Sequence, residues 1–152
     1  MSSSPDAPPL QSQPLNLVAA LFSFQGRLRR QHFFICCIFL TAGSIASNLH
    51  PIAGVILYFP LIWCSFAATT KRLHDMDYSG WLNLIPFAVV AVGTVASVLL
   101  AGVIGTGLSV LLFVGSLWAF VIGWHVWLLA SEGTSGANTY GPDSKLPQPI
   151  ST

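Results

Sequence analysis

Charge is what this sequence has least of. Lys, Arg, Asp and Glu together make up 7% of the 152 residues, whereas 53% are hydrophobic. About a quarter of the residues of a typical soluble domain are charged, because water must wet the folded surface. Six basic and five acidic side chains are too few to cover a globule of this size. The composition therefore excludes an ordinary soluble domain, and it indicates a surface that mostly contacts lipid.

The motifs of several common chemistries are also missing. Ser79 and His125 lack a Gly-x-Ser-x-Gly motif and an orienting acid, which argues against a serine hydrolase. There is no paired-cysteine motif, no pair of histidines four residues apart, and no phosphate-binding glycine loop before a helix. We therefore assign no catalytic residue, metal or cofactor. With only six basic residues, we expect no nucleic-acid partner.

Two long uncharged stretches, residues 31 to 70 and 78 to 131, dominate the chain. A membrane-spanning helix needs about 20 residues, so each stretch has room for two. Turn signals lie near their middles, at Asn48 to Pro51 and at Gly102 to Gly107. We predict an all-α integral membrane protein with four transmembrane helices in two hairpins. The predicted spans are roughly residues 32 to 48, 52 to 70, 81 to 101 and 108 to 130.

The remaining segments are predicted from their composition. Residues 14 to 24 carry apolar side chains at helical spacing, which suits either a short interfacial helix or a lead-in to the first span. Residues 1–13 and 146–152 are expected to be disordered tails, and 14–145 a single transmembrane domain. Small residues four apart, such as Gly115, Ala119 and Gly123, favour close packing in a tight bundle.

The basic residues all lie outside the spans, on one side of the predicted topology. They are Arg27, Arg29 and Arg30 before the first span, Lys71 and Arg72 between the second and third, and Lys145 after the fourth. Loops on the cytoplasmic side of a membrane are enriched in Lys and Arg. Both termini and the central loop are therefore predicted to be cytoplasmic.

The charges of the central loop have a simple structural explanation. Lys71 and Arg72 would close the second span, where the helix dipole is negative, and Asp75 and Asp77 would precede the third, where it is positive. Ser79 is a good N-cap. Helix termination and topology would then account for every charge in the loop.

A second reading of these charges is a network across the cytoplasmic face. The loop is expected to face Arg27, Arg30 and Glu132 from the other cytoplasmic segments. Arginine and carboxylate form strong, charge-assisted hydrogen bonds. A pair of Arg27 or Arg30 with Asp75 or Asp77 would join the amino-terminal helix to the loop.

Polar residues just inside the spans suggest a pocket. His125 lies near the end of the fourth span and Asn83 lies at similar depth in the third. Together with His74 and Asp75 they would form a polar pocket open to the cytoplasm, although such a histidine also serves as a structural hydrogen-bond donor. A metal site of His74, Asp75, His125 and Glu132 is an alternative that the spacing does not support.

Three segments resemble the bacterial family called domain of unknown function 805, which consists of small inner-membrane proteins. They are residues 24–30 (FQGRLRR), residues 72–75 (RLHD) with 79–81 (SGW), and residues 136–143 (GANTYGPD). The resemblance spans about residues 15 to 143. It implies a cluster of cytoplasmic positions: Gly26, Arg27, Arg30, Arg72, His74, Asp75, Ser79, Gly80, Trp81, Asn138, Tyr140 and Gly141. The chain departs from the family pattern at Tyr78, where a basic residue is common, and at Ser144, where proline is common.

These observations lead to one main functional hypothesis. We expect a non-enzymatic protein of the bacterial inner membrane that binds anionic phospholipid headgroups or a protein partner through its cytoplasmic face. One alternative is a small membrane enzyme or metal site centred on His74 and Asp75. Another is an oligomeric channel or a transporter accessory subunit, formed as a homo-oligomer or with a membrane partner.

Overall fold

The computed structural model describes residues 17–49 and 51–143, and its regular elements there are all helical. They are α1 (Leu17–Phe22), α2 (Arg30–Ser47), α3 (Pro51–Asp75), the 3-10 helix η1 (Gly80–Leu84), α4 (Ile85–Ile104) and α5 (Thr106–Ala130). The all-α prediction is confirmed. The predicted tails at 1–13 and 146–152 lie outside the described residues.

Both predicted turns between paired helices are present. The helix α2 ends at Ser47, and α3 begins at Pro51, a position where the missing N–H of proline is tolerated. A single residue, Gly105, separates α4 from α5. Its φ of +85° lies in the left-handed region that favours glycine. The two hairpins therefore form where the sequence predicts them.

The third predicted span begins as a 3-10 turn before it becomes an α-helix. Ser79 caps η1, because its hydroxyl accepts a hydrogen bond of 3.3 Å from the backbone N–H of Trp81. Gly80 follows, and a Cβ there would lie 2.7 Å from Cγ2 of Thr70. The start of η1 thus packs directly on α3, at a distance that only glycine permits.

The amino-terminal helix is a separate element and not a continuous lead-in to α2. The chain leaves the helical conformation after Phe22 and passes Gly26, whose φ is +88°, before α2 begins at Arg30. Phe24 in this connection packs edge-to-face on Trp63 of α3, with ring centroids 5.0 Å apart. Residues 14–16 of the predicted segment lie outside the described residues.

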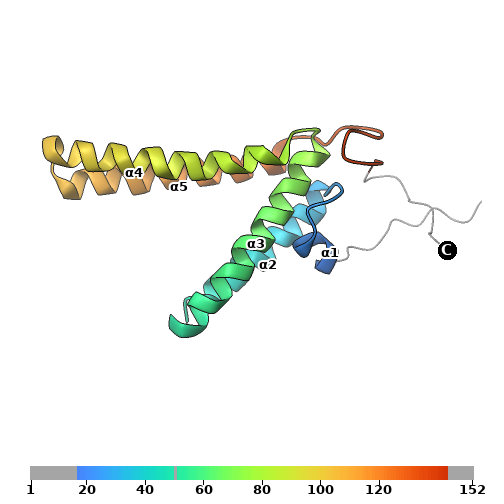
Figure 1. Ribbon diagram of the computed structural model, residues 1–152, viewed down its shortest axis with the longest axis horizontal. Helices are drawn as coiled ribbons and strands as arrows, with labels where there is room; N and C mark the ends of the chain where they lie inside the picture. The colour runs from blue at the N-terminus through green and yellow to red at the C-terminus, as the bar shows by residue number, and fades with distance from the viewer. Residues whose placement is uncertain (1–16, 50, 144–152) are drawn as a thin grey trace, which may run out of the picture.

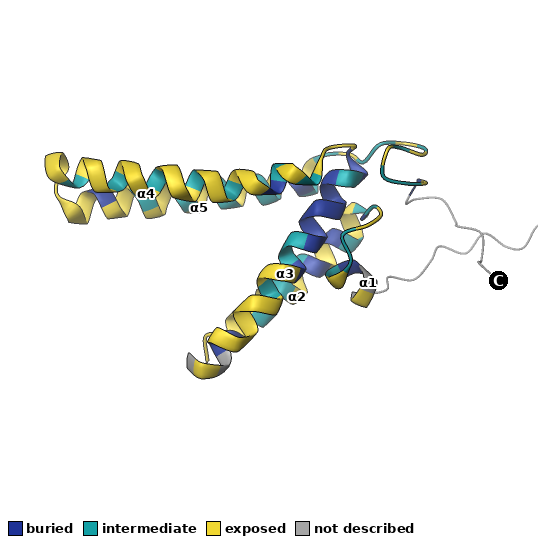
Figure 2. Ribbon diagram, in the orientation of Figure 1, coloured by how far each residue is buried: buried dark blue, intermediate teal, exposed yellow. Residues whose placement is uncertain are grey.

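The two hairpins diverge from a shared end instead of packing along their lengths (Figure 1). The helix α4 packs against α5 and η1, and it has no close backbone contact with α2 or α3. The prediction of a tight bundle is therefore wrong. Figure 2 shows the same arrangement in the burial of the residues: the buried ones concentrate at the shared end, and the far halves of both hairpins are largely exposed.

Three of the described helical segments are long and apolar enough to cross a membrane. They are Gly54–Asp75, Gly80–Ile104 and Thr106–Ala130. The helix α2 is not among them, since it has 18 residues and opens with the polar sequence Arg30, Gln31, His32. Three apolar helices suggest a membrane-spanning protein, and the fourth span and the side on which the termini lie stay predictions.

Candidate functional site

The side chain of Arg72 is enclosed at the end of α3, with 0% of its area exposed. Its Nη1 donates to Oδ2 of Asp75 at 2.6 Å, one helical turn further along the same face. Its Nε donates to the carbonyl oxygen of Leu128 at 2.8 Å, and Nη2 donates to that of Ser131 at 2.5 Å. Arg72 therefore joins the end of α3 to the end of α5.

A second buried guanidinium reaches the same carboxylate from the other side. Nε of Arg27 donates to Oδ1 of Asp75 at 3.1 Å, and the Arg27 side chain is 1% exposed. Its Nη1 donates to the carbonyl oxygen of Gly136 at 2.6 Å. Its Nη2 donates to the carbonyl oxygen and the hydroxyl of Thr134, at 2.5 and 3.1 Å. The predicted pairing of Arg27 with Asp75 is thus present, with Arg72 as a third member.

This arginine network has one carboxylate for two guanidinium groups. The guanidinium groups also donate to the carbonyl oxygens of Leu128, Ser131, Thr134 and Gly136. Every nitrogen of both guanidinium groups thus donates to at least one acceptor within the protein, as buried charges require. The network is enclosed and internally hydrogen-bonded.

The carboxyl-terminal segment is tied onto the end of α3 by further hydrogen bonds. The N–H of Thr134 donates to the carbonyl oxygen of Asp75 at 2.8 Å. The Asn138 amide donates to the carbonyl oxygen of His74, also at 2.8 Å. An isolated bridge pairs the backbones of Asn138 and Gly141. We call residues 23–29, 71–79 and 131–143 the cap, because these three segments close the shared end of the hairpins.

His74 is enclosed by its neighbours within the cap. Its ring stacks on that of Tyr140, with centroids 3.8 Å apart and planes 4° from parallel. A Cβ at Gly80 would lie 3.2 Å from its Nε2, and its buried Nδ1 has no hydrogen-bond partner in the part of the chain that the structure describes. His74 therefore contributes to packing, whereas both carboxylate oxygens of Asp75 accept hydrogen bonds from the arginines.

The described residues do not support the metal alternative. Nowhere among residues 17–49 and 51–143 do three or more His, Cys, Asp or Glu side chains gather as metal ligands would. Asp75 already accepts from two guanidinium groups, and Glu132 lies at the surface with 79% of its side chain exposed. The four residues of the hypothesis are therefore not brought together as one site.

Other predicted members lie on the surface of the cap or beside it. Arg30 pairs with Glu132 at 3.2 Å, and its side chain is 43% exposed. Oδ1 of Asp77 accepts a 3.3 Å hydrogen bond from the N–H of Thr139. Trp81 is 79% exposed, a position typical of aromatic residues at a membrane interface.

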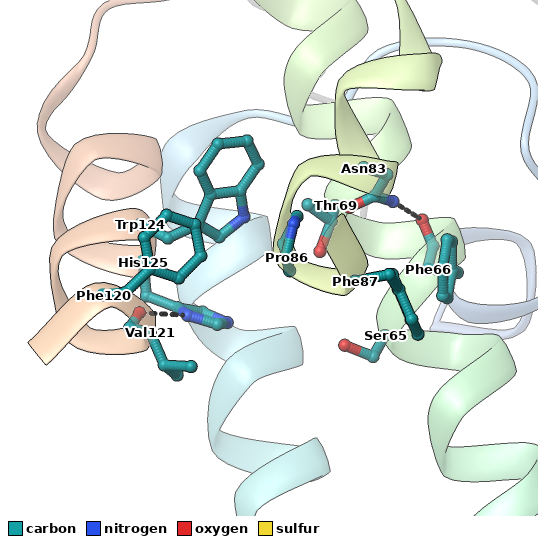
Figure 3. A pocket seen from close by; sticks show the side chains of 10 residues that line it. All are labelled: Ser65, Phe66, Thr69, Asn83, Pro86, Phe87, Phe120, Val121, Trp124 and His125. Carbon is teal, nitrogen blue, oxygen red and sulfur yellow. Dashed lines mark hydrogen bonds between the residues drawn. The ribbon is translucent and has the colours of Figure 1, made fainter. Parts of the chain in front are cut away.

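Asn83 and His125 line a cavity that contains neither His74 nor Asp75 (Figure 3). The Asn83 amide donates to the carbonyl oxygen of Phe66 and to the hydroxyl of Thr70, both at 3.0 Å. The prediction of one polar pocket with all four residues is therefore wrong. His74 and Asp75 are covered by the carboxyl-terminal segment, whereas Asn83 and His125 lie on the inner side of the angle between the hairpins.

Part of the network was not predicted from the sequence. The acceptors on Leu128, Ser131, Thr134 and Gly136 are backbone carbonyls, which any residue carries. Gly133 is a sequence feature that could have indicated this contact, because a Cβ at this position would lie 2.0 Å from Oδ2 of Asp75. A glycine beside the end of the last span thus marks the close approach of that segment to the carboxylate.

Comparison with known proteins identifies the family of the chain. The model of the family described as "Protein of unknown function (DUF805)" matches residues 21–142, which include all of the cap except residue 143. The uncharacterized protein YiiR of Escherichia coli, strains K12 and O157:H7, is 31% identical over 145 residues, covering 82% of this chain and 88% of the relative. No solved structure matches the chain. The chain therefore belongs to the DUF805 family.

Proposed function

We propose that this chain is a non-enzymatic, multi-pass protein of the bacterial inner membrane that binds a protein partner through its cap. Both termini and the cap would lie in the cytoplasm. The observation that carries the proposal is the enclosed, internally hydrogen-bonded arginine network. A reactive site needs groups left free for a substrate, whereas these charged groups hold three distant segments in one ordered surface.

Charge distribution supports the cytoplasmic placement of the cap. Arg27, Arg29, Lys71 and Arg72 are in the cap, and Arg30 adjoins it at the start of α2. The two far turns, at residues 48–50 and at Gly105, contain no charged residue. Since Lys and Arg gather on the cytoplasmic side, the cap is the end expected there.

Burial of the arginines favours a protein partner over anionic lipid. Arg27 and Arg72 are enclosed, and Lys71 is only 5% exposed. Arg29 and Arg30 remain as accessible basic residues in the described part of this face. Each basic residue near an anionic leaflet contributes about 1 kcal/mol, so two give weak binding.

The accessible surface of the cap region has the composition of a protein interface. Arg30 and Glu132 form an exposed pair, Tyr78 is exposed on the α3–η1 connection, and Trp81 is exposed in η1. Tryptophan, tyrosine and arginine are enriched among the residues that dominate binding energy. A partner with complementary charges would meet both the ion pair and the aromatic rings.

Site-specific photo-crosslinking in native membranes tests this proposal. A photoreactive amino acid would replace Arg30, Tyr78 or Trp81 in turn, with Val103 at the far turn as the matched control because it is 81% exposed. One protein adduct shared by Tyr78 in the cap and by Arg30 and Trp81, which adjoin the cap in sequence, and absent at Val103, is the expected result. Adducts with lipid alone would overturn the protein-partner proposal in favour of headgroup binding. Protein adducts at Val103 alone would overturn binding through the cap.

A second candidate is assembly within the membrane, as a homo-oligomer or as an accessory subunit. Gly115 and Gly123 of α5 have open space where a Cβ would stand, and Ala119 between them is exposed. Stripes of small residues allow close approach of helices in membranes. Detergent-free sizing tests this candidate, with the Gly115→Leu, Gly123→Leu double variant as the comparison. A wild-type particle that is already monomeric contradicts it.

A further inference from the structure

A cavity of about 120 Å³ lies inside the angle where the two hairpins diverge (Figure 3). It is separate from the cap network. Its lining comes from α3 (Ser65, Phe66, Thr69), from η1 and α4 (Asn83, Pro86, Phe87) and from α5 (Phe120, Val121, Trp124, His125). No Lys, Arg, Asp or Glu lines it. It would therefore favour a neutral ligand, because an unpaired charge is costly to bury.

Aromatic rings from both hairpins form the walls. Phe66 and Phe87 stack with centroids 5.1 Å apart and planes at 29°. Phe120 and Trp124 of α5 form a second pair, with centroids 6.1 Å apart and planes at 23°. Figure 3 shows these two pairs on opposite sides of the cavity. Aromatic walls favour a planar ring between them through offset or edge contacts.

Asn83 presents an unused acceptor in this cavity. Its two amide hydrogens are taken by the carbonyl oxygen of Phe66 and the hydroxyl of Thr70, both at 3.0 Å. Its Oδ1 has no partner in the part of the chain that the structure describes, although Asn83 is only 7% exposed. This oxygen is therefore available to a ligand hydroxyl, which would add one hydrogen bond.

His125 presents a second acceptor from the opposite wall. Its Nδ1 lies 2.9 Å from the carbonyl oxygen of Val121. Since a carbonyl oxygen can only accept, Nδ1 carries a hydrogen, and in the tautomer with its hydrogen on Nδ1 alone Nε2 is an acceptor. In Figure 3 the His125 ring and the Ser65 hydroxyl point toward one another from α5 and α3.

Two hydroxyls complete the polar lining. Neither Ser65 nor Thr69 makes a side-chain hydrogen bond within the described residues, and Thr69 is only 6% exposed. Helical Ser and Thr commonly bond the carbonyl one turn back, as Thr94 does with Val90. The cavity thus holds two fixed acceptors and two hydroxyls that can rotate to donate or accept.

We propose that this cavity binds a neutral planar ring that carries hydroxyl groups, the chemistry of a hydroquinone head group, entering from the bilayer. The ring would lie between the aromatic pairs, with its hydroxyls donating to Oδ1 of Asn83 and Nε2 of His125. The cavity of about 120 Å³ is smaller than the roughly 150 Å³ that encloses benzene, so the ring would be only partly enclosed and its substituents would extend through the open side. Phospholipid ester groups fit less well, because they only accept and would leave both acceptors unmatched.

Binding of duroquinol to the full chain in phosphatidylcholine nanodiscs under nitrogen tests the proposal. We expect saturable binding that is tighter than that of duroquinone, which carries no donor. The His125→Phe variant should bind duroquinol about tenfold more weakly, as loss of one hydrogen bond implies. Ser65→Leu, which fills the cavity, should abolish saturable binding, and Ser116→Leu on the exposed face of α5 should not.

Circular dichroism and sizing show that each variant is folded before binding is compared. Three results would overturn the proposal. They are linear partition of duroquinol without saturation, equal saturable binding by wild type and a folded Ser65→Leu variant, and tighter binding of duroquinone than of duroquinol. The proposal is independent of the cap, so a failed crosslinking experiment does not affect it.

Discussion

The two helical hairpins have similar lengths but different surroundings within the protein. In the most apolar 18-residue part of the candidate span in α3, 33% of the residues are buried. The corresponding values are 0% for the span that contains α4 and 6% for α5. The hairpin of α2 and α3 is packed against α1 and the cap at its shared end, whereas that of α4 and α5 is nearly bare (Figure 2).

This difference indicates two sources of stability in one small chain. The α2–α3 hairpin depends on a buried polar network, in which Arg27, Arg72 and Asp75 must all be present. Away from the shared end, the α4–α5 hairpin has only the contact between its own two helices, and its exposed apolar surface there is suited to lipid. Substitutions in the cap and in the second hairpin should therefore have separable effects.

The largest effect is expected from Asp75→Asn. Removing the one carboxylate between two buried arginines leaves uncompensated charge, which costs about 3–5 kcal/mol. Hydrogen exchange should increase in α1 and residues 131–143, while the far part of the α4–α5 hairpin keeps its protection. Asp77→Asn is the matched control, because Asp77 makes a single exposed hydrogen bond. Equal exchange in wild type and Asp75→Asn would contradict a stabilising network.

Gly133→Ala should disturb the cap through shape alone. The new Cβ would lie 2.0 Å from Oδ2 of Asp75, so the carboxyl-terminal segment or the carboxylate must move. We expect a loss of about 3 kcal/mol, at the upper end of the cost of overpacking. Thermal unfolding in detergent measures the loss. Gly115→Ala is the control, since a Cβ there meets nothing within 4 Å, and this variant should be as stable as wild type or more so.

Gly93→Val should disturb the α4–α5 hairpin without affecting the cap. A Cβ at Gly93 would lie 2.7 Å from Cε2 of Phe113, so α4 and α5 would have to separate or the Phe113 ring would have to turn. Because the ring can adjust, we expect a cost of about 1 kcal/mol. Exchange should rise at the α4–α5 contact and stay unchanged in the cap. Increased exchange of residues 131–143 in this variant would show that the two hairpins are not independent.

The smallest effect is expected for Arg30→Gln. Its pair with Glu132 is exposed on both sides, and such pairs contribute about 0–1 kcal/mol. Unfolding should therefore shift little, and the shift should shrink further at high salt. If this variant were as unstable as Asp75→Asn, the distinction between buried and exposed arginines would be wrong.

Much of the fold was predictable because it depends on hydrophobic runs and turn residues. The hairpin turns at Pro51 and Gly105 and the Ser79 cap all follow from local chemistry. The angle between the hairpins was not predictable. Small residues such as Gly115 and Gly123 favour helix contacts, but the sequence does not say whether the partner helix belongs to the same chain.

The candidate site was predictable in its side chains and not in its connections. Charge and family resemblance indicated Arg27, Arg72 and Asp75, but helix termination explained Arg72 equally well. The stack of His74 on Tyr140 joins residues far apart in the sequence, and no local pattern predicts it. The cavity was missed for a similar reason, since Ser65 and Phe87 look like ordinary residues of a transmembrane helix.

Cysteine labelling of the two far turns and the cap tests the central claim, that both hairpins start from one cytoplasmic cap. Cys36, Cys37 and Cys64 would first be replaced by alanine, and single cysteines introduced as Leu49→Cys, Val103→Cys or Thr139→Cys, all at exposed positions. In spheroplasts, a membrane-impermeant maleimide should label positions 49 and 103 directly, and position 139 only after lysis. Labelling of position 49 only after lysis would mean that α2 and α3 do not both cross the membrane, and would contradict the account.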